Sequence, residues 1–292
     1  IGHTLERLSQ TGTLARDEVI LCTKGGYLPY DGEPPADPGR YIIETFLRPG
    51  FLRYDDLVGG CHCLAPRYLE HQLAVSLKNL RVETIDCYYL HNPEQQLDEI
   101  PREAFLSRME AAFQFLESQV AAGRIRLYGT ATWNGYRVNA QHHGYLSLQE
   151  FVGLARRVGG ESHHFRVIQL PFNLAMPEAY AFKNQAVDGQ MLSVGEAAAR
   201  LGMSVVTSAA LLQSQLTTLP HAMRQWIPGL DTDAQRAIQF ARSTPGVTTA
   251  LTGMKRTAHV EDNLMLARLP ALTADAIERL FAHTPDAKAQ PR

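Results

Sequence analysis

Short apolar segments alternate with longer amphipathic segments along most of the 292-residue chain. The apolar segments are rich in β-branched and aromatic residues, as at residues 84–90 (TIDCYYL), which is typical of buried strands. The longer segments have helical spacing, as in the series that follows Pro66: Leu69, Leu73, Leu77 and Leu80. Strands separated by helices indicate a parallel sheet, so the alternation predicts an α/β fold.

The pattern predicts six strands and leaves one long segment without a regular period. The strands are expected at residues 19–23, 84–90, 124–130, 166–170, 204–208 and 247–251. The segment from Leu28 to Gly60 is rich in proline and glycine, which favours a long loop over regular elements. Such an insertion either covers a substrate or packs on the exterior. We expect residues 1–292 to form one domain, with a tail and helix at 269–292.

Composition excludes several functional classes. The chain is 45% hydrophobic and 20% charged, so it can bury a large core. A net charge of -2 provides no general attraction to nucleic acid or to an anionic membrane. No apolar run of about 18 residues and no signal pattern occur, so neither a membrane span nor secretion is indicated and a cytoplasmic protein is expected.

Four cysteines, Cys22, Cys61, Cys63 and Cys87, bear on redox and metal chemistry. Cys22 and Cys87 fall in predicted strands, where they suit small buried apolar residues better than a disulfide framework. The Cys61-His62-Cys63 triplet has one-residue spacing without the paired pattern of a zinc site, so no metal site is predicted.

Polar residues follow the predicted strands at the point where each strand ends. They are Lys24, His91, Thr132, Gln169, Ser208 and the run that begins at Gly253. The carboxyl ends of parallel strands share one face, where ligands bind in α/β proteins. The sequence therefore predicts one site that is assembled from many loops.

Lys24 and His91 are the candidate catalytic residues. Lys24 either acts electrostatically on a neighbour or extends to solvent from a strand end. His91 is either catalytic or a hydrogen-bonded structural histidine. Two titratable groups on one face are what carbonyl polarisation and proton transfer require.

Several motifs occur in the order of one enzyme family. They are Cys22-Thr23-Lys24, Ser76-Leu77-Lys78-Asn79-Leu80 leading to Ile85 through His91, Gly123-Arg124-Ile125-Arg126 before Tyr128-Gly129, Gln169, and Thr244-Pro245-Gly246-Val247 through Gly253 to Asn263. From about Ala15 to Arg268 the chain resembles the aldo-keto reductase family. The resemblance implies a (β/α)8 TIM barrel, NADP(H) as cofactor, and reversible reduction of an aldehyde or ketone to an alcohol.

The resemblance assigns Lys24 and His91 to two of four catalytic positions. The family's catalytic tyrosine and aspartate match nothing here, and only 23 residues precede Lys24. Six predicted strands against the barrel's eight agree, so we expect the first two strands to be missing and the native chain to extend upstream of Ile1. An alternative is that Tyr27 or Tyr89 serves as the proton donor.

The resemblance also implies cofactor-binding positions, some of them altered. They are Thr132, Gln169, Ser208, Ala209, Leu211, Gln213, Gly253, Lys255, His259, Asp262 and Asn263. Thr132 stands where the family usually has asparagine, Ala131 replaces a serine, and Ser208 replaces an aromatic residue that stacks on nicotinamide. No G-x-G-x-x-G fingerprint lies between a strand and a helix, so a Rossmann mode is not indicated.

Lys255 and Arg256 supply local positive charge, which favours NADPH over NADH unless they are simply a solvated pair. The expected partner is a small carbonyl substrate of undefined identity. A barrel without two strands would expose sheet edges, so we expect either a longer native chain or a partner that covers the gap. A homo-oligomer is also considered. The alternative function is a catalytically weak NADP-binding protein that acts through a partner.

Overall fold

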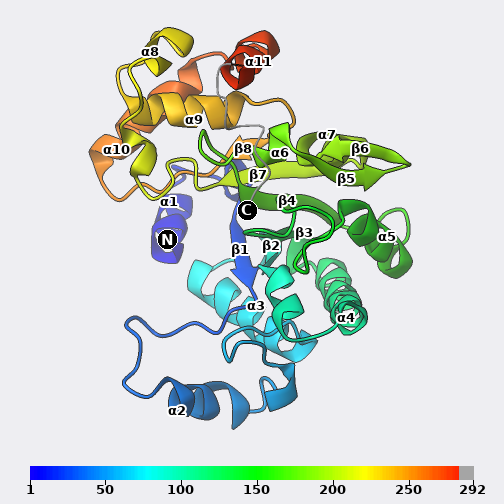
Figure 1. Ribbon diagram of the computed structural model, residues 1–292. Helices are drawn as coiled ribbons and strands as arrows, with labels where there is room; N and C mark the ends of the chain where they lie inside the picture. The colour runs from blue at the N-terminus through cyan, green and yellow to red at the C-terminus, as the bar shows by residue number, and fades with distance from the viewer. Residues whose placement is uncertain (283–292) are drawn as a thin grey trace. The chain divides into compact units, whose positions relative to one another are not determined.

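The computed structural model describes residues 1–282, and residues 283–292 lie outside the described part. Six strands form one sheet in the order β1-β2-β3-β4-β7-β8 (Figure 1). They are β1 (Cys22–Gly25), β2 (Ile85–His91), β3 (Ile125–Ala131), β4 (Phe165–Pro171), β7 (Ser204–Ser208) and β8 (Thr249–Ala250). The pairs β1/β2, β2/β3 and β7/β8 are parallel, so the predicted parallel α/β sheet is confirmed.

Two strands are shorter than expected or displaced along the chain. The first was expected at residues 19–23 but begins at Cys22, because the Leu21 N–H donates to the Asp86 carboxylate at 2.8 Å instead of joining a strand. The last was expected at residues 247–251 and has only two residues, Thr249 and Ala250. In both cases the apolar run was read correctly and the strand boundary was not.

The chain divides into two compact units, which are described separately. Unit 1 comprises Ile1–Ala131 and Phe151–Val167, and unit 2 comprises Thr132–Glu150 and Ile168–Arg292. The division falls within β4 and near the start of α5 (Leu148–Gly159).

Unit 1 contains β1, β2 and β3 with the helices that connect them. These helices are α1 (Gly2–Gln10), η1 (Arg16–Glu18), α3 (Pro66–Leu80), η4 (Pro93–Asp98) and α4 (Arg102–Ala121). Pro66 begins α3, and Arg81 ends it in the left-handed conformation. An aromatic core forms where the Phe113 ring lies 5.1 Å from Tyr128 and 5.0 Å from Phe165, measured between ring centroids.

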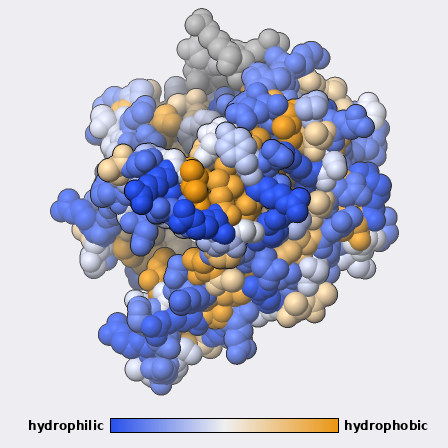
Figure 2. All heavy atoms as spheres, turned by 90° about the horizontal axis from the view of Figure 1, so that it is seen from below, coloured by the Kyte–Doolittle hydropathy of each residue, from blue (hydrophilic) through white to orange (hydrophobic). Residues whose placement is uncertain are grey.

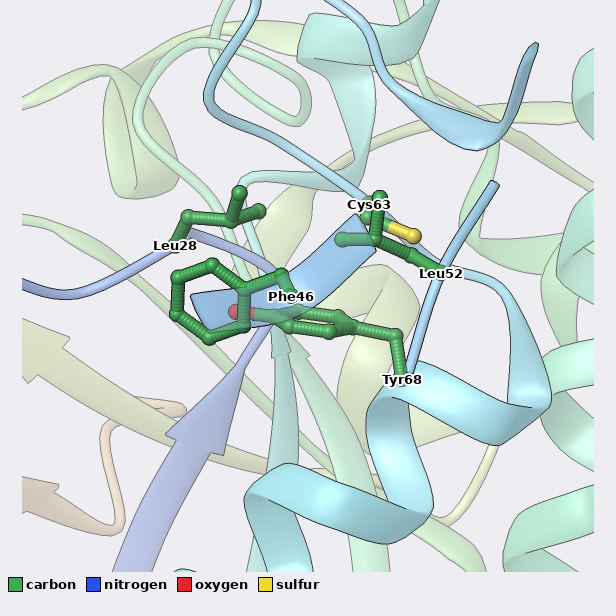
Figure 3. Close-up of a cluster of buried hydrophobic side chains, with 5 residues drawn as sticks. All are labelled: Leu28, Phe46, Leu52, Cys63 and Tyr68. Atoms are coloured by element: carbon green, nitrogen blue, oxygen red, sulfur yellow. The ribbon is translucent and has the colours of Figure 1, made fainter. Parts of the chain in front are cut away.

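The insertion from Leu28 to Gly60 contains regular structure, so the expectation of a loop without elements was wrong. It forms α2 (Pro38–Ile42), a π-helical turn η2 (Ile43–Leu47) and η3 (Tyr54–Asp56). The Asp37 side chain caps α2 by accepting from the Arg40 N–H at 2.9 Å. Leu28, Phe46 and Leu52 pack with Tyr68 of α3 in a small apolar core (Figure 3). The insertion therefore folds onto α3.

Unit 2 contains β7 and β8 together with an antiparallel hairpin that the sequence pattern did not predict. The hairpin joins β5 (Lys183–Val187) to β6 (Gln190–Ser193) through Asp188 and Gly189, both with positive φ. The helices are α6 (Glu178–Ala181), α7 (Val194–Arg200), η5 (Gln215–Thr217), α8 (Met223–Trp226), α9 (Asp233–Ser243), α10 (Thr257–Leu264), η6 (Met265–Arg268) and α11 (Ala274–Ala282). The expected C-terminal helix is α11, whereas the last ten residues of the expected tail, 283–292, lie outside the described part.

Apolar side chains also reach the surface. Figure 2 shows hydrophobic side chains gathered in the middle of one face with hydrophilic side chains around them. Ile20, Tyr54 and Leu264 are among the large hydrophobic residues that are exposed. Between residues 1 and 282, no helix combines the length and the apolar character needed to span a membrane.

Candidate active site

Unit 1 brings Lys24 and His91 together at the carboxyl ends of two neighbouring strands. Lys24 lies opposite Tyr89 in the parallel register of β1 and β2, and His91 is the last residue of β2. Burial and the nearby charge of Lys24 lower the pKa of His91 to about 4. Burial also lowers the pKa of Lys24. The pair therefore presents a neutral imidazole beside a partly desolvated ammonium group.

Tyr89 lies on β2 opposite Lys24, and its side chain is buried. Burial raises its pKa well above the ordinary value, and the neighbouring thiols of Cys87 and Cys22 raise it further. Cys87 is buried as predicted, but Cys22 is exposed, so that half of the prediction was wrong. The reason is that, within residues 1–282, β1 is the first strand in the sheet order and pairs with β2 alone.

Tyr27 follows β1 and packs against His91. Its ring meets the His91 imidazole edge-on, with the centroids 4.9 Å apart and the planes at 80°. Its hydroxyl donates to Gln95 Oε1 and accepts from Asn92 Nδ2 at 3.1 Å. Burial raises the pKa of Tyr27. Of the two tyrosines considered as proton donors, Tyr27 is the one in contact with the imidazole of His91.

His62 also lies at this site, although in the sequence it stood out only as part of the Cys61-His62-Cys63 triplet. It is fully buried, and its Nε2 lies 2.7 Å from the main-chain oxygen of His91. Its Nδ1 lies 2.7 Å from Gln96 Nε2. Both ring nitrogens are thus engaged in hydrogen bonds. No sequence motif links His62 with His91, which lies 29 residues further along the chain.

Unit 2 contains the predicted cofactor residues, and it joins two of them directly. Thr132 follows β3, and its N–H donates to the main-chain oxygen of Gln169 on β4 at 2.8 Å. The Thr132 hydroxyl lies 3.4 Å from the same oxygen, and both side chains are buried. Ser208 ends β7, and its main-chain oxygen accepts from the Phe172 N–H at 3.1 Å.

The loop after β7 has a conformation that side chains disfavour. Ala209 and Gln213 have φ values of 56° and 50°, and Leu212 and Ser214 are also left-handed. Asn173 Nδ2 donates to the main-chain oxygen of Ala209 at 2.9 Å. Leu211 is partly buried in the same loop. Outliers of this kind cluster at active sites and ligand clamps, and the phosphate-binding role of this loop stays a prediction.

The remaining cofactor residues lie after β8 and on α10. Gly253 and Lys255 precede the helix, whereas His259, Asp262 and Asn263 are on it. The main-chain oxygen of Asp262 accepts from Gln235 Nε2 at 3.1 Å, which ties α10 to α9. Lys255 is exposed. The cofactor roles of these residues stay predictions.

Comparison with known proteins places this geometry in a family. The model of the aldo/keto reductase family matches residues 1–146. No curated protein matches the chain. An aldo-keto reductase from Bacillus halodurans in its holo form superposes with a TM-score of 0.59 at 17% identity, over 94% of this chain and 76% of that one. A thermostable aldo-keto reductase in complex with the inhibitor epalrestat gives a TM-score of 0.52 at 17% identity, over 75% of this chain and 67% of that one.

At this level of identity the superpositions establish the fold. The α/β architecture with a parallel sheet is that of the aldo-keto reductase (β/α)8 barrel, as predicted. The family model covers half of the chain, including Lys24 and His91. The chain is therefore a member of the aldo/keto reductase family.

Proposed function

We propose that this protein reduces an aldehyde or ketone to an alcohol with NADPH. The observation that carries the proposal is that Lys24 lies near a neutral His91 at the carboxyl ends of β1 and β2, close enough for its charge to lower the pKa of His91. Family membership supports an oxidoreductase. We propose only the chemical class of the substrate, an aldehyde or ketone, because specificity in such folds depends on variable loops.

Lys24 and His91 have complementary roles in this reaction. The Lys24 ammonium stabilises negative charge that develops on the carbonyl oxygen, and its low-dielectric surroundings strengthen that effect. A neutral His91 imidazole can donate one hydrogen bond to the same oxygen and orient it. Bound NADPH would supply the hydride.

Two tyrosines of this chain, Tyr27 and Tyr89, are candidates for the group that donates a proton to the carbonyl oxygen. Tyr27 contacts His91, whereas Tyr89 is buried beside the thiols of Cys22 and Cys87. Replacing each with phenylalanine removes only the hydroxyl. A loss of turnover in one variant, with NADPH affinity retained, identifies the donor, and unchanged turnover in both excludes both tyrosines.

The residues present fit NADPH at its phosphate end. Within residues 1–282, neither Lys255 nor Arg256 forms an ion pair, and both side chains are exposed just before α10. Free cations of this kind suit the 2′-phosphate of NADPH. The strained loop at Ala209 and Gln213 supports a second phosphate contact. Thr132 and Gln169 would hold the carboxamide.

The test is NADPH oxidation by the purified protein against a panel of aldehydes and ketones. We expect Lys24→Met and His91→Leu to lower kcat/KM on the order of 10²-fold, with the Kd for NADPH little changed. Lys78→Met, at the exposed last turn of α3, is the matched control and should retain activity. NADPH binding without turnover on the whole panel would overturn the proposal in favour of a binding protein that acts through a partner.

A further inference from the structure

A chain of directional hydrogen bonds runs from α4 to the end of β2. Arg108 Nη1 donates to Gln96 Oε1 at 2.5 Å. Gln96 Nε2 donates to His62 Nδ1, and His62 Nε2 donates to the main-chain oxygen of His91, both at 2.7 Å. Each side chain in this series thus forms a hydrogen bond with the next residue of the series. It ends on the residue that the proposed function places against the substrate.

Arg108 fixes the tautomer of His62 through Gln96. A guanidinium can only donate, so the oxygen of the Gln96 amide must face it and the NH2 group must face His62. His62 Nδ1 is then an acceptor, and the proton resides on Nε2, where the His91 carbonyl requires a donor. Burial lowers the pKa of His62 to about 4, which agrees with a neutral ring.

The start and end of the insertion meet at the same point. The Leu28 N–H donates to the Cys61 oxygen and the Cys63 N–H donates to the Gly26 oxygen, each at 2.8 Å, and Tyr27 pairs with His62 in an antiparallel bridge. We call residues 26–28 and 61–63 the stem of the insertion. The stem places His62 and Tyr27 beside His91.

Gly26 leaves the space that this contact needs. Its φ is 144°, and a Cβ there would lie 2.9 Å from the His91 oxygen and 3.0 Å from His62 Nε2. A side chain at this position would therefore separate the imidazole from the carbonyl. The glycine at position 26 therefore allows the hydrogen bond between His62 Nε2 and the His91 oxygen.

We propose that His62 is a positioning residue for His91: its Nε2–H holds the His91 carbonyl, while Tyr27 packs edge-on against both imidazoles. His91 Cα and its side chain are thereby fixed relative to β1, and the insertion stem becomes one wall of the substrate site. The inference rests on the proposed function only for its consequence in catalysis. The hydrogen-bond relay itself is a property of unit 1.

Nitrogen-15 NMR of histidine-labelled protein tests the relay without any substrate. His62 should show the neutral Nε2–H tautomer. Gln96→Glu places a carboxylate against His62 Nδ1, so a proton should move to Nδ1. The His91 ring signals should shift in His62→Leu and Gln96→Glu, less in His62→Gln, which keeps an N–H donor, and not in His71→Gln. His71 stacks on Phe51 of the insertion at 3.8 Å and is outside the relay, so it serves as the matched control.

Steady-state kinetics test the consequence for the substrate. We expect the KM for the carbonyl substrate to rise on the order of tenfold in His62→Leu, with the KM for NADPH unchanged. A smaller folded fraction lowers the apparent kcat but leaves KM unchanged, so this split separates positioning from a general loss of structure. His62→Gln should recover most of the wild-type KM.

The outcomes separate this inference from the proposed function. If His91 signals and carbonyl KM are the same in His62→Leu as in wild type, the inference is wrong even when the protein reduces carbonyls. If the Nδ1–H tautomer is found in wild type, the relay is wrong. If the relay holds by NMR and no carbonyl is reduced, the positioning of His91 stands and the proposed function fails.

Discussion

Cys22 is the residue whose environment differs most from what its sequence position indicated. It lies in an apolar strand, yet it is exposed and is paired in register with Cys87. A hydrogen bond from the Cys87 thiol lowers the pKa of Cys22 to about 7. By contrast, burial raises the pKa of Cys63 to about 12. Thiolate character, and with it nucleophilicity, is therefore concentrated at Cys22.

The first prediction concerns thiol reactivity. Iodoacetamide should modify Cys22 well before Cys63, and the rate at Cys22 should rise through a midpoint near the pKa of about 7. Peptide mass spectrometry over a pH series measures both. Cys87→Ala removes this hydrogen-bond donor and should move the midpoint upward. Equal rates at Cys22 and Cys63 in the folded protein would contradict the assignment.

The second prediction concerns the stability of the protein in acid. The pKa of His62 is 6.5 when unfolded and about 4 when folded, so between these values the unfolded state binds more protons. Above pH 6.5 the imidazole is neutral in both states, and the free energy of unfolding is not reduced by this group. As the pH falls from 6.5 through 4, the free energy of unfolding decreases by about 3 kcal/mol. Urea unfolding at several pH values should show a smaller acid loss in His62→Gln than in wild type. An identical pH dependence would disprove the depressed pKa.

At the scale of elements, the periodicity of apolar residues was sufficient to predict the buried strands and the amphipathic helices. The helix predicted after Pro66 from Leu69, Leu73, Leu77 and Leu80 is observed as α3 (Pro66–Leu80). The insertion was recognised, but its short helices were not predicted, because many prolines and glycines surround a helix that is defined by its Asp37 cap. The β5–β6 hairpin was missed because its strands are polar, although Asp188-Gly189 is a hairpin signal.

In the candidate site, too, some residues could be predicted from the sequence and others could not. Lys24 and His91 were found because each follows a recognisable strand. His62, Gln96 and Arg108 were not found, because their relation depends on how the insertion stem pairs with the end of β1. A contact between residues far apart in the chain leaves no local pattern.

The third prediction tests whether the insertion has its own core. Phe46 is 2% exposed and packs on Tyr68 of α3, so Phe46→Ala should lower the free energy of unfolding by about 3 kcal/mol. Tyr54→Ala, at a side chain that is 79% exposed, is the control and should change it by less than about 0.5 kcal/mol. Chemical denaturation measures both. Equal stabilities would indicate that the cluster adds nothing to the fold.

At the scale of the whole molecule, cofactor binding should contribute to stability. A ligand that binds only the folded state stabilises it by about 2.7 kcal/mol at a hundred times its Kd. The fourth prediction is therefore that NADPH raises the Tm, and that NADH does so less at the same concentration. Lys255→Ala combined with Arg256→Ala should remove the difference between the two cofactors. An equal shift with both in the wild type would argue against recognition of the 2′-phosphate.

The insertion stem has a consequence for how the length of this chain can vary. Its two main-chain hydrogen bonds close the segment between Leu28 and Cys61 beside His91, so residues beyond the stem are separated from the imidazole by a fixed junction. Closing a longer segment costs little, about 0.6 kcal/mol for each doubling of length. Exposed parts of the segment can thus be lengthened while the junction that holds His91 is kept. Deletions are different, because the segment also contains Phe46 of the small apolar core and the Asp55 and Asp56 carbonyls that accept from Arg108.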